Sequence, residues 1–184
     1  MYEIEMHKPT EEFARCWRSA GRHLSNIAEY PVQGWLKDDL VPPFLEHMSF
    51  RLGNQLFFVR LVGAENYLEV PGNPTGVMNI AEGCNGHACI MPMRQSGVGW
   101  VVDAPGWGLI DAKTGDPIDP VMLVTDEKIE MTEWEIQDLG VQVVRTYVVD
   151  QLNYHLMSSQ GNPDVDPSIW FVGDDGPEWV VVRA

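Results

Sequence analysis

The sequence predicts an α+β fold in a single domain of residues 1–184, with two long helices packed on a mixed or mainly antiparallel sheet. Two segments, 48–62 and 168–184, consist of short apolar strands joined at a Gly-centred turn, a pattern typical of β-hairpins. A segment with a helix start signal precedes each hairpin. We therefore divide the chain into a helix plus hairpin at 10–62, a Gly- and Pro-rich β-meander at 63–130, and a second helix plus hairpin at 131–184.

The first helix is predicted to begin after Thr10 and to end at the Tyr-Pro pair at 30–31. Thr10 is a good N-cap, and Glu11 and Glu12 place negative charge at the positive end of the helix dipole. Apolar residues at spacings of three and four predict one buried stripe along this helix. The stripe consists of Phe13, Trp17, Ala20, Leu24 and Ile27.

The first hairpin is predicted to turn at Gly53-Asn54. Its first strand, from Met48 to Leu52, alternates apolar and polar residues, which predicts one buried and one exposed face. Its second strand, at 56–59, is apolar at every position, as is typical of a strand inside a sheet. We expect residues 56–59 at the centre of the core.

The middle of the chain is predicted to contain a short helix and a β-meander. An Asn-Pro pair at 73–74 opens the helix, which ends at Gly83. The turns of the meander, at 104–106 and 113–115, are made of residues that favour tight reversals. The strands of the meander are expected at 88–93, 98–103, 107–111 and 118–124.

The second long helix is predicted to start with a capping box made by Thr132 and Glu135 and to run to Asp150. We expect most of this helix to be covered, because its apolar stripe is broad. The stripe consists of Ile136, Leu139, Val143 and Tyr147, widened by Val144 and Val148. After a short strand at 152–157, the last strand, 179–182, is apolar enough to belong inside the sheet or under a partner, and a homodimer would cover it.

The charge of the chain favours positively charged partners. Twelve Lys and Arg residues stand against 27 Asp and Glu residues, which gives a net charge of −15, and no basic cluster is visible in the sequence. Nucleic-acid phosphates would repel such a chain, so direct nucleic-acid binding is not expected. Two alternatives stay open: acidity that only keeps the protein soluble, and an acidic antagonist that occupies a nucleic-acid-binding protein.

Three cysteines, an odd and small number, do not indicate a disulfide framework. The N-terminal segment has no basic region that leads into an apolar one, so no secretory signal is expected. No apolar run approaches the roughly 20 residues of a membrane-spanning helix. We therefore expect a cytoplasmic protein without a membrane-bound segment.

Cys84, His87 and Cys89 form the densest chemical cluster in the sequence. Thiolate and imidazole are ligands that zinc prefers, and Glu82 or water could complete an open site. No second Cys/His pair follows, and buried cysteines beside a hydrogen-bonded histidine are the simpler interpretation. We therefore expect no cofactor, with zinc as the alternative. A cysteine nucleophile with His87 as its base is the thiol-dependent form of the enzyme hypothesis.

The C-terminal segment resembles the core of the PD-(D/E)xK nucleases in one respect. A helix is followed by Pro163-Asp164 and then by a hairpin strand that contains Glu178. Val180 stands where that family has its lysine, so the resemblance does not imply an active nuclease.

Four apolar residues of the middle segment are the candidate ligand-binding residues: Trp100, Trp107, Met91 and Met93. Glycines flank both tryptophans and leave room for another molecule, and methionine adapts to varied apolar partners. Since no catalytic pattern outweighs its structural interpretation, we expect a binding protein rather than an enzyme. Its partner is expected to be a protein or a small apolar or cationic ligand, with the metal- or thiol-dependent enzyme as the alternative.

Overall fold

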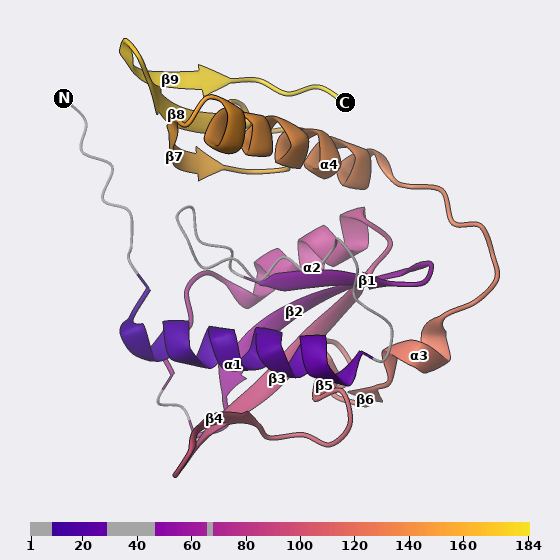
Figure 1. Cartoon of the computed structure of the whole chain (residues 1–184). Coiled ribbons are helices and arrows are strands. Elements are labelled where there is room, and N and C mark those ends of the chain that lie inside the picture. The colour runs from indigo at the N-terminus through magenta and orange to yellow at the C-terminus, as the bar shows by residue number, and fades with distance from the viewer. Residues whose placement is uncertain (1–8, 29–46, 66–67) are drawn as a thin grey trace. The chain divides into compact units, whose positions relative to one another are not determined.

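The computed structural model describes residues 9–28, 47–65 and 68–184 (Figure 1). These residues have an α+β fold with a mixed six-stranded sheet and a separate three-stranded antiparallel sheet. The sequence predicted one sheet. Two sheets form because the C-terminal hairpin pairs with the strand His155–Ser159 and not with the first hairpin. The described residues divide into a first unit, 9–28, 47–65, 68–82 and 86–126, and a second unit, 83–85 and 127–184.

The first unit contains the six-stranded sheet, in which the strand order is β1-β2-β3-β5-β6 and β4 also pairs with β3. Its elements are α1 (Glu11–Ile27), β1 (Met48–Leu52), β2 (Gln55–Gly63), α2 (Pro74–Gly83), β3 (His87–Ser96), β4 (Gly99–Val102), β5 (Leu109–Asp111), β6 (Pro117–Ile118) and α3 (Pro120–Leu123). The sheet is mixed because α2 is the crossover between the parallel strands β2 and β3, while the other pairs are antiparallel.

Helix α1 begins after Thr10 as the sequence predicted and ends at Ile27, while the Tyr-Pro pair at 30–31 lies outside the described residues. The Oγ1 atom of Thr10 accepts a hydrogen bond from the backbone N–H of Phe13 at 3.1 Å, which caps the first turn. Four members of the predicted stripe are completely buried: Phe13, Trp17, Ala20 and Leu24. This face of α1 packs against β3 and β4, so that the helix lies across the sheet (Figure 1).

The first hairpin is also confirmed, with Gly53 and Asn54 between β1 and β2. Strand β2 lies inside the sheet, antiparallel to β1 and parallel to β3. Residues 56–59 are at most 8% exposed, as expected for the centre of the core. Their continuous apolar run therefore reflects burial on both faces of the strand.

The predicted strand at 118–124 is wrong. Strand β6 ends at Ile118, and the chain then turns into the short helix α3. The reason is the Asp-Pro pair: Oδ1 of Asp119 accepts from the N–H of Val121 at 3.1 Å, and Pro120 occupies the first helical position, which suits its fixed φ.

The second unit is a helix on the three-stranded sheet, with the strand order β7-β8-β9. Its elements are α4 (Glu133–Thr146), a π-helical turn (Tyr147–Gln151), β7 (His155–Ser159), β8 (Ile169–Gly173) and β9 (Gly176–Val180). The predicted capping box is present, since Thr132 Oγ1 accepts from Glu135 N at 3.3 Å and Glu135 Oε2 accepts from Thr132 N at 3.0 Å.

The predicted buried stripe of α4 is wrong at its four main positions, because the helix buries a different face, which includes the two widening residues Val144 and Val148. Ile136, Leu139, Val143 and Tyr147 are each more than a third exposed. The core of this unit consists of Val141, Val148, Leu156, Ile169, Phe171 and Val182. Gly140 contributes to this choice: a Cβ there would lie 3.0 Å from Ala184 and 3.3 Å from Val182, which is a tight contact, so glycine favours close packing of the C-terminal segment on α4.

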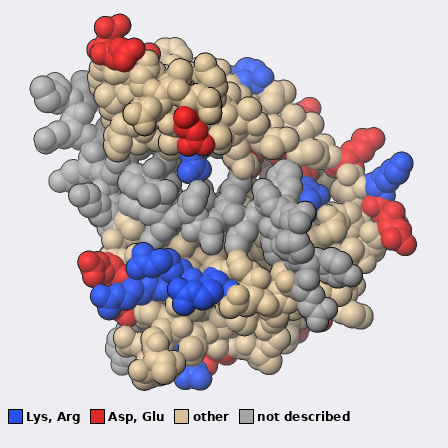
Figure 2. All heavy atoms as spheres, in the orientation of Figure 1, with Lys and Arg blue, Asp and Glu red and all other residues tan. Residues whose placement is uncertain are grey.

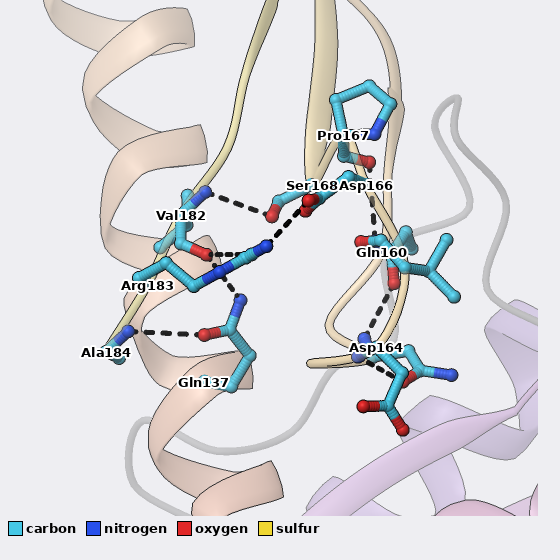
Figure 3. A network of polar contacts seen from close by, with 11 residues as sticks. Gln137, Gln160, Asp164, Asp166, Pro167, Ser168, Val182, Arg183 and Ala184 are labelled. Atoms are coloured by element: carbon cyan, nitrogen blue, oxygen red, sulfur yellow. Dashed lines mark hydrogen bonds and ion pairs between the residues drawn. The ribbon is translucent and has the colours of Figure 1, made fainter.

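Polar side chains fasten the C-terminal segment to the rest of the second unit (Figure 3). The buried Gln137 donates from Nε2 to the carbonyl of Val182 at 2.9 Å, and its Oε1 accepts from the N–H of Ala184 at 3.2 Å. The Oγ of Ser168 accepts from Val182 N at 3.1 Å. Side-chain hydrogen bonds, and not a strand ladder, therefore hold the segment after β9. The prediction that 179–182 is an interior strand is wrong, because β9 is an edge strand and Trp179 is 58% exposed.

Candidate functional site

Trp107 is one of the predicted ligand-binding residues that line a pocket. It lies just before β5, is only 8% exposed, and stacks on Phe50 with ring centroids 6.0 Å apart and an interplanar angle of 5°. The Nε2 of His23 lies 3.3 Å from the backbone oxygen of Trp107, and because a carbonyl only accepts, this ring nitrogen is the donor. Helix α1 and the sheet thus hold Trp107 from two directions.

The turn that carries Trp107 needs glycine after it. Gly108 has a φ of +71°, and a Cβ at this position would lie 2.2 Å from Cγ1 of Val102. Its N–H donates to the carbonyl of Pro105 at 3.1 Å and closes the turn. The sequence suggested that Gly108 leaves space for a ligand. The side chain of Val102 occupies that space instead.

A cavity of about 750 Å³ opens beside Trp107, and we call it the Trp107 pocket. Its walls come from the end of α1, the β1–β2 turn, Trp107 itself and the α3 segment. Among the described residues of the lining, Asp119 is the only ionisable one, and the others are apolar or glycine. The lining residues are Ile27, Ala28, Leu52, Gly53, Trp107, Asp119, Val121 and Val124.

Hydrogen bonds fix the wall that α3 contributes. Asn54, in the β1–β2 turn, donates from Nδ2 to Thr125 Oγ1 at 2.8 Å and accepts at Oδ1 from Thr125 N at 3.0 Å. Next to this clamp, Val124 lies so close to Gly53 that a Cβ on the glycine would be 2.5 Å from Val124 Cγ1. The β1–β2 turn and the segment after α3 are therefore joined side by side.

The other three predicted ligand-binding residues lie elsewhere. Met91 and Met93 are completely buried in β3 and belong to the core of the first unit. Trp100, in β4, donates from Nε1 to Glu12 Oε1 at 2.8 Å, on the side of the sheet that α1 covers. Sequence reasoning assigned Asp119 and Asn54 to turns and not to a ligand pocket; the Asp-Pro pair and the Gly-Asn turn were the available signals.

His87 begins β3 and contacts two neighbouring side chains. Its Nε2 lies 2.9 Å from Oε1 of Gln55, and its ring stacks on Phe57 with centroids 4.9 Å apart. Burial lowers the pKa of His87, and the negative charge of Asp111 only partly opposes this effect. The ring is therefore a neutral imidazole at physiological pH.

Cys84 and Cys89 are both buried, and neither forms a disulfide bond. Burial, and to a lesser extent Asp111, raise the pKa of Cys89 to about 12, so that it carries its proton at neutral pH. Its Sγ donates to the carbonyl of His87 at 3.6 Å. Within the described parts of the chain, no three His, Cys, Asp or Glu side chains gather closely enough to hold a metal ion, so the zinc hypothesis has no preformed ligand set among them.

Comparison with known proteins gives one match. A family model described as "Domain of unknown function (DUF8840)" matches residues 134–184, which include β7, β8, β9 and nearly all of α4. No curated protein matches the chain. No solved structure matches it either. No helix among the described residues combines the length and apolar character needed to span a membrane. The match lies wholly in the second unit, whereas the Trp107 pocket lies in the first.

Proposed function

We propose that the protein is a binding protein whose first unit takes a small, mainly apolar ligand into the Trp107 pocket. The observation that carries this proposal is the pocket itself: its volume of about 750 Å³ lies within the roughly 300–1,000 Å³ of small-molecule sites. An apolar lining with few polar groups is also typical of such sites.

Contacts within the protein itself fix the walls of the pocket. Trp107 is fixed by its stacking on Phe50 and by the hydrogen bond from His23. The α3 wall is fixed by the clamp between Asn54 and Thr125. Binding to walls that are already ordered avoids much of the entropy cost of ordering them, which supports affinity for a ligand of modest size.

Asp119 narrows the chemistry of the ligand. Its Oδ1 is engaged in capping α3, and its carboxylate places negative charge at the rim of an otherwise apolar cavity. An anionic ligand would meet both this carboxylate and the net charge of −15. The pocket therefore suits a neutral or cationic apolar molecule.

Fluorescence titration with phenylnaphthylamine, a neutral apolar dye, tests this proposal. Val121→Glu puts a carboxylate into the lining at a position that is 57% exposed, so the fold should tolerate it. We expect the affinity of the dye to fall by about tenfold or more, because the dye would have to desolvate the new charge. Val98→Glu adds the same charge at a position 92% exposed in the β3–β4 turn and is the matched control.

The proposal would be overturned if the unchanged protein bound neither this dye nor a cationic apolar dye. It would also be overturned if Val121→Glu and Val98→Glu bound the dye as tightly as the unchanged protein does. In the second case the dye would be binding to another apolar surface.

A further inference from the structure

The outer face of α1 carries a basic row that the net charge of the chain conceals. Arg15, Arg18 and Arg22 are three and four residues apart, so they are neighbours on one face of the helix and span about 10 Å. All three are exposed. Figure 2 shows Lys and Arg atoms gathered over α1, on a surface where acidic side chains are otherwise common.

This row borders a hollow of about 270 Å³ between α1 and the β3–β4 hairpin. Besides the three arginines, the hollow is lined by Glu12, Ser19, Gln95, Gly99 and Trp100. The lining therefore combines three guanidinium groups with one carboxylate, a hydroxyl, an amide and an indole. Its volume lies just below the roughly 300 Å³ at which typical small-molecule sites begin, which suits a small ligand.

The carboxylates near the hollow are already engaged with other groups. Oε1 of Glu12 accepts from Nε1 of Trp100 at 2.8 Å and from Nε2 of Gln95 at 3.2 Å. Arg15 pairs with Glu11 at 3.3 Å. Among the described residues, the guanidinium groups of Arg18 and Arg22 have neither an ion pair nor a hydrogen bond, so these two have donors free for an anion.

The overall charge of −15 does not prevent an anion from binding here. At about 0.15 M salt the Debye length is about 8 Å, so a bound anion interacts mainly with the charges that line the hollow. Among the described residues of the lining, three arginines outnumber one glutamate, and the nearby Glu11 offsets Arg15, with which it pairs. Guanidinium groups also match the geometry of phosphate oxygens, to which they can donate two parallel hydrogen bonds.

We propose that this hollow binds a small molecule that carries a phosphate group, with Arg18 and Arg22 as the principal charged donors. Trp100 and Gln95 form the opposite wall and are held in place through Glu12. Among the described residues, the hollow and the Trp107 pocket share no lining residue, so this proposal does not rest on the apolar site proposed above.

An NMR titration that follows the indole N–H signal of Trp100 tests the proposal, with inorganic phosphate and phenyl phosphate as probes. We expect both probes to shift this signal, and phenyl phosphate to bind more tightly because its ring adds apolar contact with the wall. Arg18→Ala and Arg22→Ala should each weaken binding by about threefold to tenfold, as expected for partly exposed charged contacts. Arg18→Lys, which keeps the charge and loses the guanidinium fork, should fall between Arg18→Ala and the unchanged protein.

Lys113→Ala is the matched control, because it removes one exposed positive charge from the turn between β5 and β6, outside the lining of the hollow. Its affinity for phenyl phosphate should stay within about twofold of the unchanged protein. The proposal is overturned if neither probe shifts the Trp100 signal. It is equally overturned if Lys113→Ala weakens binding as much as the arginine variants do, since the effect would then be one of general charge.

Discussion

Replacement of Gly53 by alanine tests the contact that closes one side of the Trp107 pocket. Gly53 has a φ of +56°, a conformation that costs an L-residue about 1 kcal/mol or more. The added Cβ would also lie 2.5 Å from Cγ1 of Val124. Val124 is 38% exposed and can move towards solvent, so we expect the overlap to destabilise the fold by about 1 kcal/mol, at the low end of the range for overpacked contacts. The total expected loss of stability is about 2 kcal/mol.

Gly115→Ala separates the two contributions. Gly115 has a φ of +80° but no atom within 4 Å of an added Cβ, so this variant should lose only the backbone part, about 1 kcal/mol. Urea unfolding is followed by the indole N–H signal of Trp107, which reports on the first unit even if the second unfolds separately. Adding Val124→Ala to Gly53→Ala should remove the excess loss. Equal losses in the two glycine variants would refute a close contact between the turn and Val124.

Two further predictions concern the buried polar and thiol groups. Gln137→Leu should destabilise the second unit by about 1–3 kcal/mol in urea unfolding, because it leaves the N–H of Ala184 without its partner. The control Gln142→Leu, on the same helix, removes only a half-buried hydrogen bond to the side chain of Asp138, so the free energy of unfolding should fall by about 0.5 kcal/mol or less. Equal losses of stability in the two variants would contradict the role of Gln137. The pKa of Cys89 is about 12 in the folded protein and near the ordinary 9.0 in the unfolded chain. The unfolded chain therefore loses the thiol proton at lower pH, so the free energy of unfolding should fall as pH rises from 9 towards 12. Cys89→Ala should show a shallower fall in the urea midpoint over this range, and parallel curves would contradict the burial of the thiol.

Strong local signals made much of the fold predictable. The cap at Thr10, the spacing of the stripe that begins at Phe13, and the capping box at Thr132 are determined within one or two helical turns, so neighbours in sequence suffice to identify them. The continuous apolar run at 56–59 likewise indicates burial without knowledge of the partner strands. These elements appear in the structure where the sequence placed them.

The errors arose where two alternatives satisfy the same local pattern. Helix α4 has apolar residues on more than one face, and the choice between Val143 and Val141 as the buried residue depends on the close approach of the C-terminal segment at Gly140. The run after Ile118 is apolar enough for a strand, but the cap supplied by Asp119 decides for a helical turn. Tertiary packing and a single side-chain hydrogen bond thus overrode the periodicity.

The candidate sites were only partly predictable for a related reason. The glycines around Trp107 pointed to the right turn, but the pocket is assembled from segments as distant in sequence as Ile27 and Val124. The helical period that predicts the apolar stripe of α1 also makes Arg15, Arg18 and Arg22 neighbours, but the hollow that they border depends on Gln95 and Trp100 from β3 and β4, which the sequence could not place there. In both cases the chemistry depends on a juxtaposition that the fold creates.

The most direct test of the central claim, that the Trp107 pocket holds a small apolar ligand, is the location of bound phenylnaphthylamine by nuclear Overhauser effects. The account predicts contacts from the dye to the methyl groups of Ile27, Val121 and Val124, which line the pocket. Contacts confined to other exposed methyl groups, such as those of Val143 on α4, would contradict it.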